Sequence, residues 1–321
     1  MWLQTRMYLL VALLFGILYG VMVAVGTLMG VGSATSYLVM AFAFLGFQYL
    51  IGPSLVGWTM RVKWVSEKEA PELHKMVAEL AASANLPKPK VGISQLNIPN
   101  AFAFGRTQGD GRICVTRGIV NLLSQDELRA VLGHEMAHIK HRDMAIITLL
   151  SAIPMILYWL AWSMMWGGTG NRREGGNYAA LVGFAAFILY FITNLLVLYG
   201  SRIREYYADL GSVQLGNPPH CMATALYKLV YGNARLKNNN EELKRVEGVR
   251  AFFVNDPARA WYEVKELSQI DRDLSGTISY DELADLRQKQ VRLGVADKMM
   301  EAFTTHPNML KRIKHLSTLT V

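Results

Sequence analysis

Long stretches of this sequence lack charge. Only 18% of its 321 residues are charged, and no Lys, Arg, Asp or Glu occurs in residues 7–60, 144–171 or 175–201. A helix needs about 20 apolar residues to cross a hydrocarbon core of ~30 Å, so the first stretch is long enough for two spans and each of the others for one. The sequence therefore predicts about four membrane spans, near residues 7–30, 37–60, 144–167 and 178–200. A cleaved signal peptide is the alternative for residues 1–30, but the apolar run in this segment is longer than the apolar region of a typical signal peptide.

Cysteine is scarce as well. Cys114 and Cys221 are the only two, and no CxxC spacing occurs. This argues against a disulfide framework of the kind that holds small secreted domains together. We expect both side chains to be free thiols in a reducing compartment.

Basic residues gather where the predicted spans meet the polar parts of the chain. They follow the second span, precede the third and follow the fourth: Arg61 and Lys63, Lys140 and Arg142, Arg202 and Arg204. The short loop 31–36 has none, so the positive-inside tendency predicts a multi-pass protein of the plasma (inner) membrane with its polar part in the cytoplasm. Arg172 and Arg173 argue the other way and leave open a shallow hairpin of the last two segments. The basic residues lie at the ends of predicted membrane spans, and this position explains them, so no nucleic-acid partner is expected.

The polar stretch 124–143, SQDELRAVLGHEMAHIKHRD, contains His134, Glu135 and His138 in the order His-Glu-x-x-His. Residues four apart share one face of an α-helix, so both histidines can present ring nitrogens to one metal ion while Glu135 lies beside the open coordination position. Chance gives only about 0.01 such patterns in a chain of this composition. The pattern predicts half of a zinc hydrolase site.

Local signals also specify a helix here. Ser124 followed by Glu127 is a capping-box pattern, which marks a helix start. The next apolar residues recur at helical spacing: Leu128, Val131, Leu132 and Met136.

A third zinc ligand must come from another segment, because catalytic zinc usually has three protein ligands and one water. The stretch 201–216, SRIREYYADLGSVQLG, follows the fourth predicted span and reads as the polar start of a helix, with Glu205 and Asp209 on one face. One carboxylate can bind zinc while the other accepts a hydrogen bond from the remote nitrogen of a zinc-bound histidine. The alternative is a surface helix whose acids pair with Arg202 and Arg204.

The segment between the second span and the motif predicts a small α/β unit. Residues 66–86 have the periodicity of an amphipathic helix, and residues 90–95, 97–105 and 112–116 are typical of strands, with a turn at 108–111. Phe102 and Phe104 fit core packing about as well as a functional role. In the functional interpretation their strand is an exposed edge to which an extended peptide adds by main-chain hydrogen bonds.

Four collinear motifs resemble those of one family. PNAFAFG, HEMAHIKHRD, SRIREYYAD and FTTHPNMLKRIKHL (303–316) are similar, in this order, to segments of the HtpX-type membrane zinc metalloproteases, which are gluzincins, and more distantly of the CAAX prenyl endoproteases. The resemblance covers nearly the whole chain except about residues 258–300. It implies a zincin-like α+β metalloprotease domain built from residues 61–143 and 201–321, which acts on misfolded or damaged membrane proteins.

The resemblance also implies roles for single residues. His134, His138 and Glu205 would be the zinc ligands, Glu135 the general base and Asp209 a support for a ligand. His306 in the Thr-His-Pro motif would stabilise the transition state. The peptide-binding strand would contain Asn100, Ala101, Phe102, Ala103 and Phe104, although many relatives have Thr where this chain has Phe104.

The part outside the resemblance contains a calcium-binding pattern. Calcium takes six to eight oxygen ligands, and an EF-hand loop supplies them from positions 1, 3, 5, 7, 9 and 12, with Gly at position 6. Residues 271–282, DRDLSGTISYDE, have Gly276 at position 6 and apolar residues before and after the loop that suit flanking helices. The six predicted ligands are Asp271, Asp273, Ser275, Thr277 (backbone carbonyl), Ser279 and Glu282. We expect Ca²⁺ to stabilise or gate the protease domain, although EF-hands normally pair and no second loop is present. An acidic turn between helices is the alternative.

These features predict a membrane-bound zinc endopeptidase with lipid and unfolded polypeptide as its partners. A CAAX-type prenyl protease is disfavoured because four spans are too few for a large membrane chamber. A calcium-responsive scaffold with a structural zinc is also disfavoured. A structural zinc site prefers four protein ligands, whereas only three can be named here, and it would have no use for Glu135. The sequence does not determine the oligomeric state.

Overall fold

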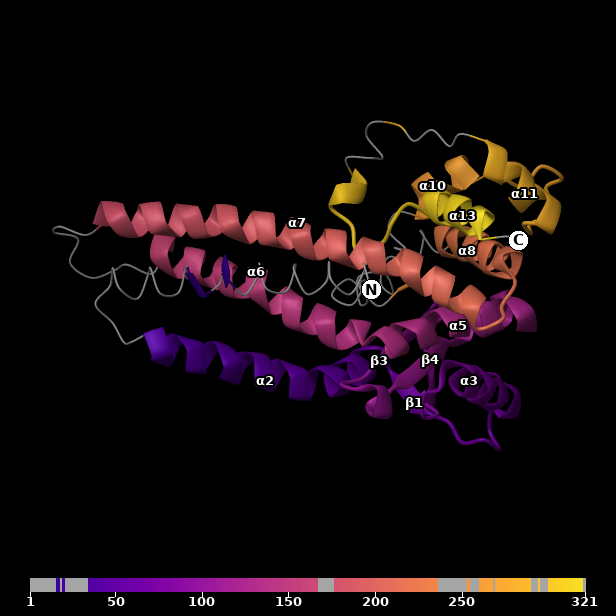
Figure 1. The fold of residues 1–321 in the computed structure, drawn as a ribbon, viewed down its shortest axis with the longest axis horizontal. Helices are drawn as coiled ribbons and strands as arrows, with labels where there is room; N and C mark the ends of the chain where they lie inside the picture. The colour runs from indigo at the N-terminus through magenta and orange to yellow at the C-terminus, as the bar shows by residue number, and fades with distance from the viewer. Residues whose placement is uncertain are drawn as a thin grey trace. The chain divides into compact units, whose positions relative to one another are not determined.

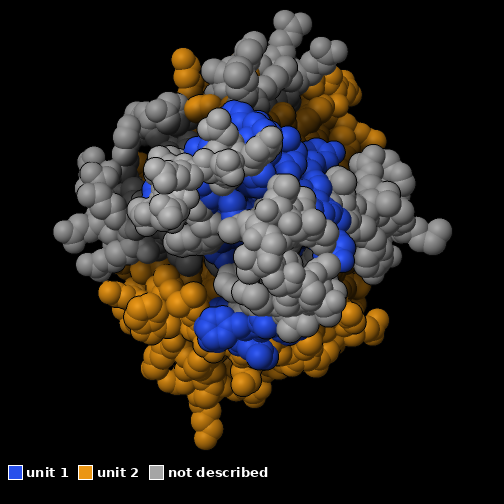
Figure 2. Space-filling model, turned by 90° about the vertical axis from the view of Figure 1, so that its left-hand side faces the viewer, with its two compact units in different colours: residues 1–52, 146–201 blue, residues 53–145, 202–321 orange. Residues whose placement is uncertain are grey.

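The computed structural model describes residues 16–17, 19–20, 34–166, 176–235, 253–254, 260–267, 269–289, 294 and 300–319. The chain divides into two compact units, which Figure 2 shows in different colours. Unit 1 contains residues 1–52 and 146–201, and unit 2 contains residues 53–145 and 202–321. All of the predicted site residues belong to unit 2.

Unit 2 contains a mixed four-stranded sheet in the order β1-β2-β4-β3. The strands are β1 (Val62–Trp64), β2 (Lys90–Ser94), β3 (Ala101–Phe104) and β4 (Arg112–Thr116). β2 and β4 are parallel, and β1 and β3 flank them as antiparallel edges. β3 is thus an edge strand, as predicted. The short 3₁₀ helix η1 (Gln108–Asp110) connects it to β4.

Seven helices of unit 2 lie within the described ranges. They are α3 (Pro71–Ala84), α4 (Arg117–Leu122), α5 (Gln125–His141), α8 (Pro219–Arg235), α10 (Ala260–Leu267), α11 (Tyr280–Gln288) and α13 (Met309–Thr318). α5 carries the His-Glu-x-x-His motif and lies between β3, β4 and α3 on one side and α8 on the other (Figure 1). Because it has protein on both sides, every residue from Ala130 to Ile139 is buried or half-buried.

The ends of α5 follow local rules. Ser124 accepts a hydrogen bond from the Glu127 N–H while the Glu127 carboxylate accepts one from the Ser124 N–H, which completes the predicted capping box. Arg142 ends the helix in the left-handed conformation, with φ 58°. A new helix, α6 (Asp143–Trp166), begins at the next residue.

Three long apolar helices coincide with predicted spans: α2 (Ala34–Thr59), α6, and α7 (Gly176–Gln214). Among the described residues, one helical stretch, Ala180–Gln214, is long and apolar enough to cross a membrane by length and composition. The predicted first span lies almost entirely outside the described residues, so the number of spans stays a prediction.

The structure corrects three boundaries and adds one strand. The segment 201–216 does not start a new helix, because α7 continues through it without a break to Gln214. The predicted helix 66–86 begins only at Pro71, because the Glu69 carboxylate accepts hydrogen bonds from the Ser66 N–H and hydroxyl and holds a turn there. The strand predicted at 97–105 is limited to β3. The short strand β1 was not predicted, because three residues are too few to show a period.

Candidate active site

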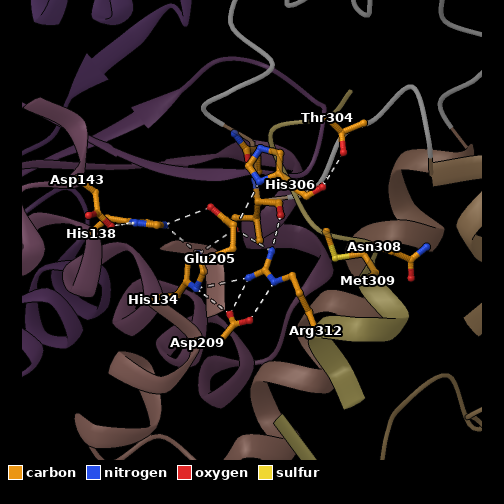
Figure 3. A network of polar contacts seen from close by, with 12 residues as sticks. His134, His138, Asp143, Glu205, Asp209, Thr304, His306, Asn308, Met309 and Arg312 are labelled. Atoms are coloured by element: carbon orange, nitrogen blue, oxygen red, sulfur yellow. Dashed lines mark hydrogen bonds and ion pairs between the residues drawn. The ribbon is translucent and has the colours of Figure 1, made fainter. Parts of the chain in front are cut away.

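Three side chains from two helices converge at the centre of unit 2. His134 and His138 lie one turn apart on α5, and their Nε2 atoms are 3.1 Å from each other. Glu205 reaches them from α7, with Oε2 at 3.6 Å from His134 Nε2 and Oε1 at 3.6 Å from His138 Nε2. Figure 3 shows the three side chains pointing toward one another. They form a group that could hold a metal ion, all three being buried.

Small residues allow α5 and α7 to approach closely enough for this. A Cβ added at Gly211 of α7 would lie 2.5 Å from the Ala137 Cβ of α5. A Cβ added at Gly133 would lie 2.8 Å from the Ser212 hydroxyl, which donates a hydrogen bond of 2.6 Å to the Ala130 carbonyl. Because no larger side chain separates the two helices here, the carboxylates of α7 reach the histidines of α5.

Each histidine is held by a carboxylate at its other nitrogen. His134 Nδ1 lies 2.9 Å from Asp209 Oδ1, and His138 Nδ1 lies 2.8 Å from Asp143 Oδ2. A carboxylate accepts hydrogen bonds, so a neutral ring held in this way would carry its proton on Nδ1 and present the lone pair of Nε2. Two such lone pairs 3.1 Å apart would repel each other unless a proton or a metal ion lay between them.

The buried charges lead to the same conclusion. Four buried carboxylates lie beside two buried guanidinium groups, so acidic groups outnumber basic ones where a cation would bind: Glu135, Asp143, Glu205 and Asp209 against Arg204 and Arg312. Two imidazole nitrogens and one carboxylate are a usual ligand set of catalytic zinc, with one position left for water. The residues present therefore fit zinc.

Arg312 of α13 connects the two acids of α7. Its Nε and Nη2 donate to the Asp209 carboxylate at 2.9 and 2.6 Å, and its Nη1 lies 3.0 Å from Glu205 Oε2. The side chain is fully buried, and these carboxylates outweigh the effect of burial and raise its pKa. Nothing in the sequence marks Arg312 among its basic neighbours, because only the fold shows that it is buried. Asp143 was missed for the same reason.

Glu135 lies on α5 between the two histidines in sequence and is 5% exposed. Burial raises the pKa of its carboxyl group, against the opposing effects of the two histidines and of a hydrogen bond from the Ala103 backbone. A carboxylate with a raised pKa accepts a proton more readily, which suits a general base.

The structure brings His306 to the same place. Its Nδ1 lies 3.4 Å from Glu205 Oε2, and the side chain is buried, with no hydrogen-bond partner for either ring nitrogen among the described residues. Its loop is fixed by Arg202, which donates to the carbonyls of Ala302 and Thr304 at 3.0 and 2.8 Å. The imidazole is thus held beside the three candidate ligands.

The predicted substrate strand lies next to the site, but its side chains are buried. Phe102 and Phe104 are 1% and 2% exposed and stack on each other, so these two rings pack in the core. The Thr116 N–H donates to the Asn100 carbonyl. Since hydrogen-bonded pairs alternate in an antiparallel ladder, the main-chain groups of Ala101 and Ala103 point away from β4. Both residues are nevertheless buried, and the Ala103 backbone bonds to Glu135, so the predicted edge is not an exposed one.

The structure also gathers the predicted calcium ligands that carry charge. The carboxylates of Asp271, Asp273 and Glu282 have oxygens within 4.8 Å of one another. Gly276 has φ 78°, the left-handed conformation that explains glycine at position 6. Ser275, Thr277 and Ser279 lie in the same loop, where Ser279 also caps α11.

Comparison with known proteins agrees with this geometry. The model of peptidase family M48 matches residues 67–320. The chain belongs to peptidase family M48. It is 52% identical over 243 residues to a protease HtpX homolog of Methanothermobacter thermautotrophicus, and this match covers 76% of the M48 chain and 92% of the relative. The chain is therefore a metalloprotease of the HtpX type. It is also 38% identical over 282 residues to a protease HtpX homolog of Moorella thermoacetica, which covers 87% of this chain and 93% of that one.

Among solved structures, the M48 chain is similar to Ste24p of S. mikatae. The TM-score is 0.50 at 15% sequence identity, and the match covers 98% of this chain. It covers 64% of the Ste24p chain, which is less than two thirds of that longer protein. At this identity the similarity shows the fold alone.

We predict that Arg312→Met lowers both stability and zinc content. Removing one partner of a buried ion pair leaves the carboxylates of Asp209 and Glu205 uncompensated, which costs about 3 kcal/mol or more. The measurements are thermal unfolding of the purified protein in detergent and its zinc content by atomic spectroscopy.

Lys311→Met on the same helix is the matched control. Lys311 pairs with Glu301 and is 38% exposed, so its loss should cost no more than about 1 kcal/mol and leave the zinc content unchanged. Equal zinc content and stability in the Arg312 and Lys311 variants would show that Arg312 does not support the site.

Proposed function

We propose that this chain is a membrane-bound, zinc-dependent endopeptidase that hydrolyses peptide bonds of misfolded or damaged membrane proteins. The convergence of His134, His138 and Glu205 beside the buried Glu135 supports this proposal most directly. His134, His138 and Glu205 would hold one zinc ion.

Bound zinc would polarise the scissile carbonyl and lower the pKa of the attacking water. Glu135 takes a proton from that water and returns it to the leaving amine, which is the reason for a buried carboxylate at this place. Asp209 accepts the Nδ1 proton of His134 at 2.9 Å and so keeps Nε2 free for the metal. His306, whose Nδ1 lies 3.4 Å from Glu205 Oε2, would donate a hydrogen bond to the oxyanion of the reacting carbonyl.

The edge of β3 that faces away from β4 would align the substrate. An extended peptide adds to such an edge through main-chain hydrogen bonds, here to Ala101 and to the carbonyl of Ala103. Glu135 accepts a hydrogen bond from the Ala103 backbone, so a peptide on this edge would run past the general base. Recognition through the main chain does not depend on side-chain sequence, which suits unfolded substrates of many kinds.

The decisive experiment concerns Glu135. Glu135→Gln should keep zinc but lose cleavage of an unfolded protein by about 10²-fold or more, because glutamine cannot accept the proton. Removing zinc with a chelator should abolish cleavage by the wild type, and adding zinc back should restore it.

Asp126→Asn is the matched control, because this exposed acid lies on the first turn of the same helix. It should cleave at the wild-type rate. A Glu135→Gln protein that cleaves equally fast would overturn the proposed mechanism. A prenylated CAAX peptide, offered in parallel, separates general proteolysis from the CAAX-type alternative, since a prenyl protease would prefer it to unfolded protein.

In this proposed function the chain crosses the plasma (inner) membrane four times, with the protease unit in the cytoplasm. The apolar helices α2, α6 and α7 and the basic residues at their polar ends support this topology. The loop 168–177 would then lie outside the cell.

Cysteine labelling tests the topology. After Cys114 and Cys221 are replaced, a cysteine in 168–177 should react with a membrane-impermeant maleimide on intact cells. A cysteine at the exposed Lys88 should react only after permeabilisation. A loop that cannot be labelled from outside would favour the shallow hairpin instead.

The proposal includes calcium modulation through residues 271–282. The loop is tied to α8, because Thr224 accepts from the Ile278 N–H at 2.9 Å and donates to its carbonyl at 3.0 Å. Tyr227 of the same helix donates to Asp271 at 2.8 Å, and Lys228 donates to Glu127 at the start of α5 at 2.8 Å. One helix thus connects the loop with the helix of the zinc motif.

A second connection runs through α13, which carries Arg312 into the site. On the α10 side, Glu266 accepts from Asn308 at 2.6 Å and Glu263 from the Met309 N–H at 3.4 Å. On the α11 side, Lys314 donates to the Leu286 carbonyl at 2.6 Å. A calcium-dependent change between α10 and α11 would therefore act on α13.

We expect Ca²⁺ to raise the melting temperature and change the rate of proteolysis. Ligand binding at 100 times Kd stabilises a folded state by about 2.7 kcal/mol. Asp273→Asn, at an exposed loop carboxylate, should abolish both effects, whereas Asp126→Asn, at an exposed carboxylate of α5 outside the loop, should keep them. If Ca²⁺ changes neither melting nor proteolysis of the wild type, the calcium proposal fails and the zinc proposal stands.

A further inference from the structure

The histidine ligands His134 and His138 are held by carboxylates from different parts of the chain. The partner of His134, Asp209, lies on α7, one turn after the ligand Glu205. The partner of His138 is Asp143, whose Oδ2 lies 2.8 Å from His138 Nδ1 and which is 4% exposed. Figure 3 shows Asp143 on the far side of the His138 ring from Glu205.

The backbone break at Arg142 makes this contact possible. In a continuous α-helix, a residue five positions after His138 lies roughly 140° around the axis from it and faces away. Arg142 takes the left-handed conformation with φ 58°, and its N–H donates to the carbonyls of His138 and Ile139. The chain therefore turns at this point, and the first side chain of α6 reaches back to the last ligand of α5.

Arg204 fixes Asp143 from a third helix. Its Nη1 donates to the Asp143 backbone carbonyl at 2.6 Å and lies 3.8 Å from Asp143 Oδ1. Arg204 is 4% exposed and directly precedes the candidate ligand Glu205 on α7. The buried cation compensates the charge of Asp143, as Arg312 does for Asp209.

We propose that Asp143, clamped by Arg204, is the positioning residue of His138. It accepts the Nδ1 proton, selects the tautomer that presents Nε2 to the metal and fixes the plane of the ring. This inference rests on the proposed zinc site. It makes that site depend on the junction between α5 and α6, since the same residue ends the turn and begins the apolar helix.

Zinc affinity tests the inference, measured by competition with a chromophoric chelator. Loss of such a hydrogen-bond partner typically costs 10–100-fold in metal affinity. We expect Asp143→Asn to weaken zinc binding about 10-fold, because an amide keeps a hydrogen bond but not the charge, and Asp143→Leu to weaken it more. The visible absorption bands of the cobalt-substituted protein should also change, because the ring is no longer held.

Glu127→Gln is the matched control, at a buried carboxylate on the opposite end of α5 that pairs with Lys228. It should lower the melting temperature without changing zinc affinity or the cobalt spectrum. If the Asp143 variants fail to fold, Arg204→Lys gives the second measurement, with an intermediate loss of affinity expected.

Two outcomes separate the inference from the function on which it rests. If Asp143→Asn, or in its place Arg204→Lys, keeps wild-type zinc affinity and cobalt spectrum, the positioning role is wrong and the zinc site stands. If the wild-type protein binds no zinc, the proposed function itself fails.

Discussion

Buried charge is the constraint on which this structure depends. Four carboxylates lie buried beside two histidines, and each would cost several kcal/mol without a partner. Arg312 compensates Asp209 and Glu205, and Arg204 compensates Asp143. The pairs require α5, α6, α7 and α13 to meet at one point, so the site and the core of unit 2 depend on the same contacts.

Glycine and a left-handed residue bring these helices together. Gly211 lets α7 approach Ala137 of α5 closely enough for its carboxylates to reach the two histidines. Arg142 turns the chain so that Asp143, the first residue of α6, contacts His138. Substitutions at these positions would therefore act on the metal site, although neither residue touches a metal.

The EF-hand-like segment, which consists of α10, the loop 271–282 and α11, packs against other helices of unit 2. Its loop is held by Thr224 and Tyr227 of α8, while α10 contacts the start of α13 and α11 contacts its middle. Because α13 carries Arg312, the same helix contacts both the EF-hand-like segment and the acids Glu205 and Asp209 of α7.

Local sequence by itself determined the elements that carry their own signals. The capping box at Ser124, the spacing of His134 and His138, the strand that returns at residues 112–116 and the turn glycine Gly276 all depend on short-range rules, and the structure has each of them. Residue spacing left open which acid of α7 faces the metal. The tertiary structure decided it, because Glu205 faces both Nε2 atoms while Asp209 lies behind His134 at Nδ1.

Only the tertiary structure could reveal Arg312 and Asp143. Arg312 is one of several basic residues in KRIKHL, and Asp143 directly follows His141 and Arg142. In the sequence, both therefore look like solvated surface charges. Their roles come from burial against partners on helices far away in the chain, which no local pattern records. Motif spacing therefore identified the atoms that would hold a metal, whereas packing between distant helices decided which charges hold those atoms in place.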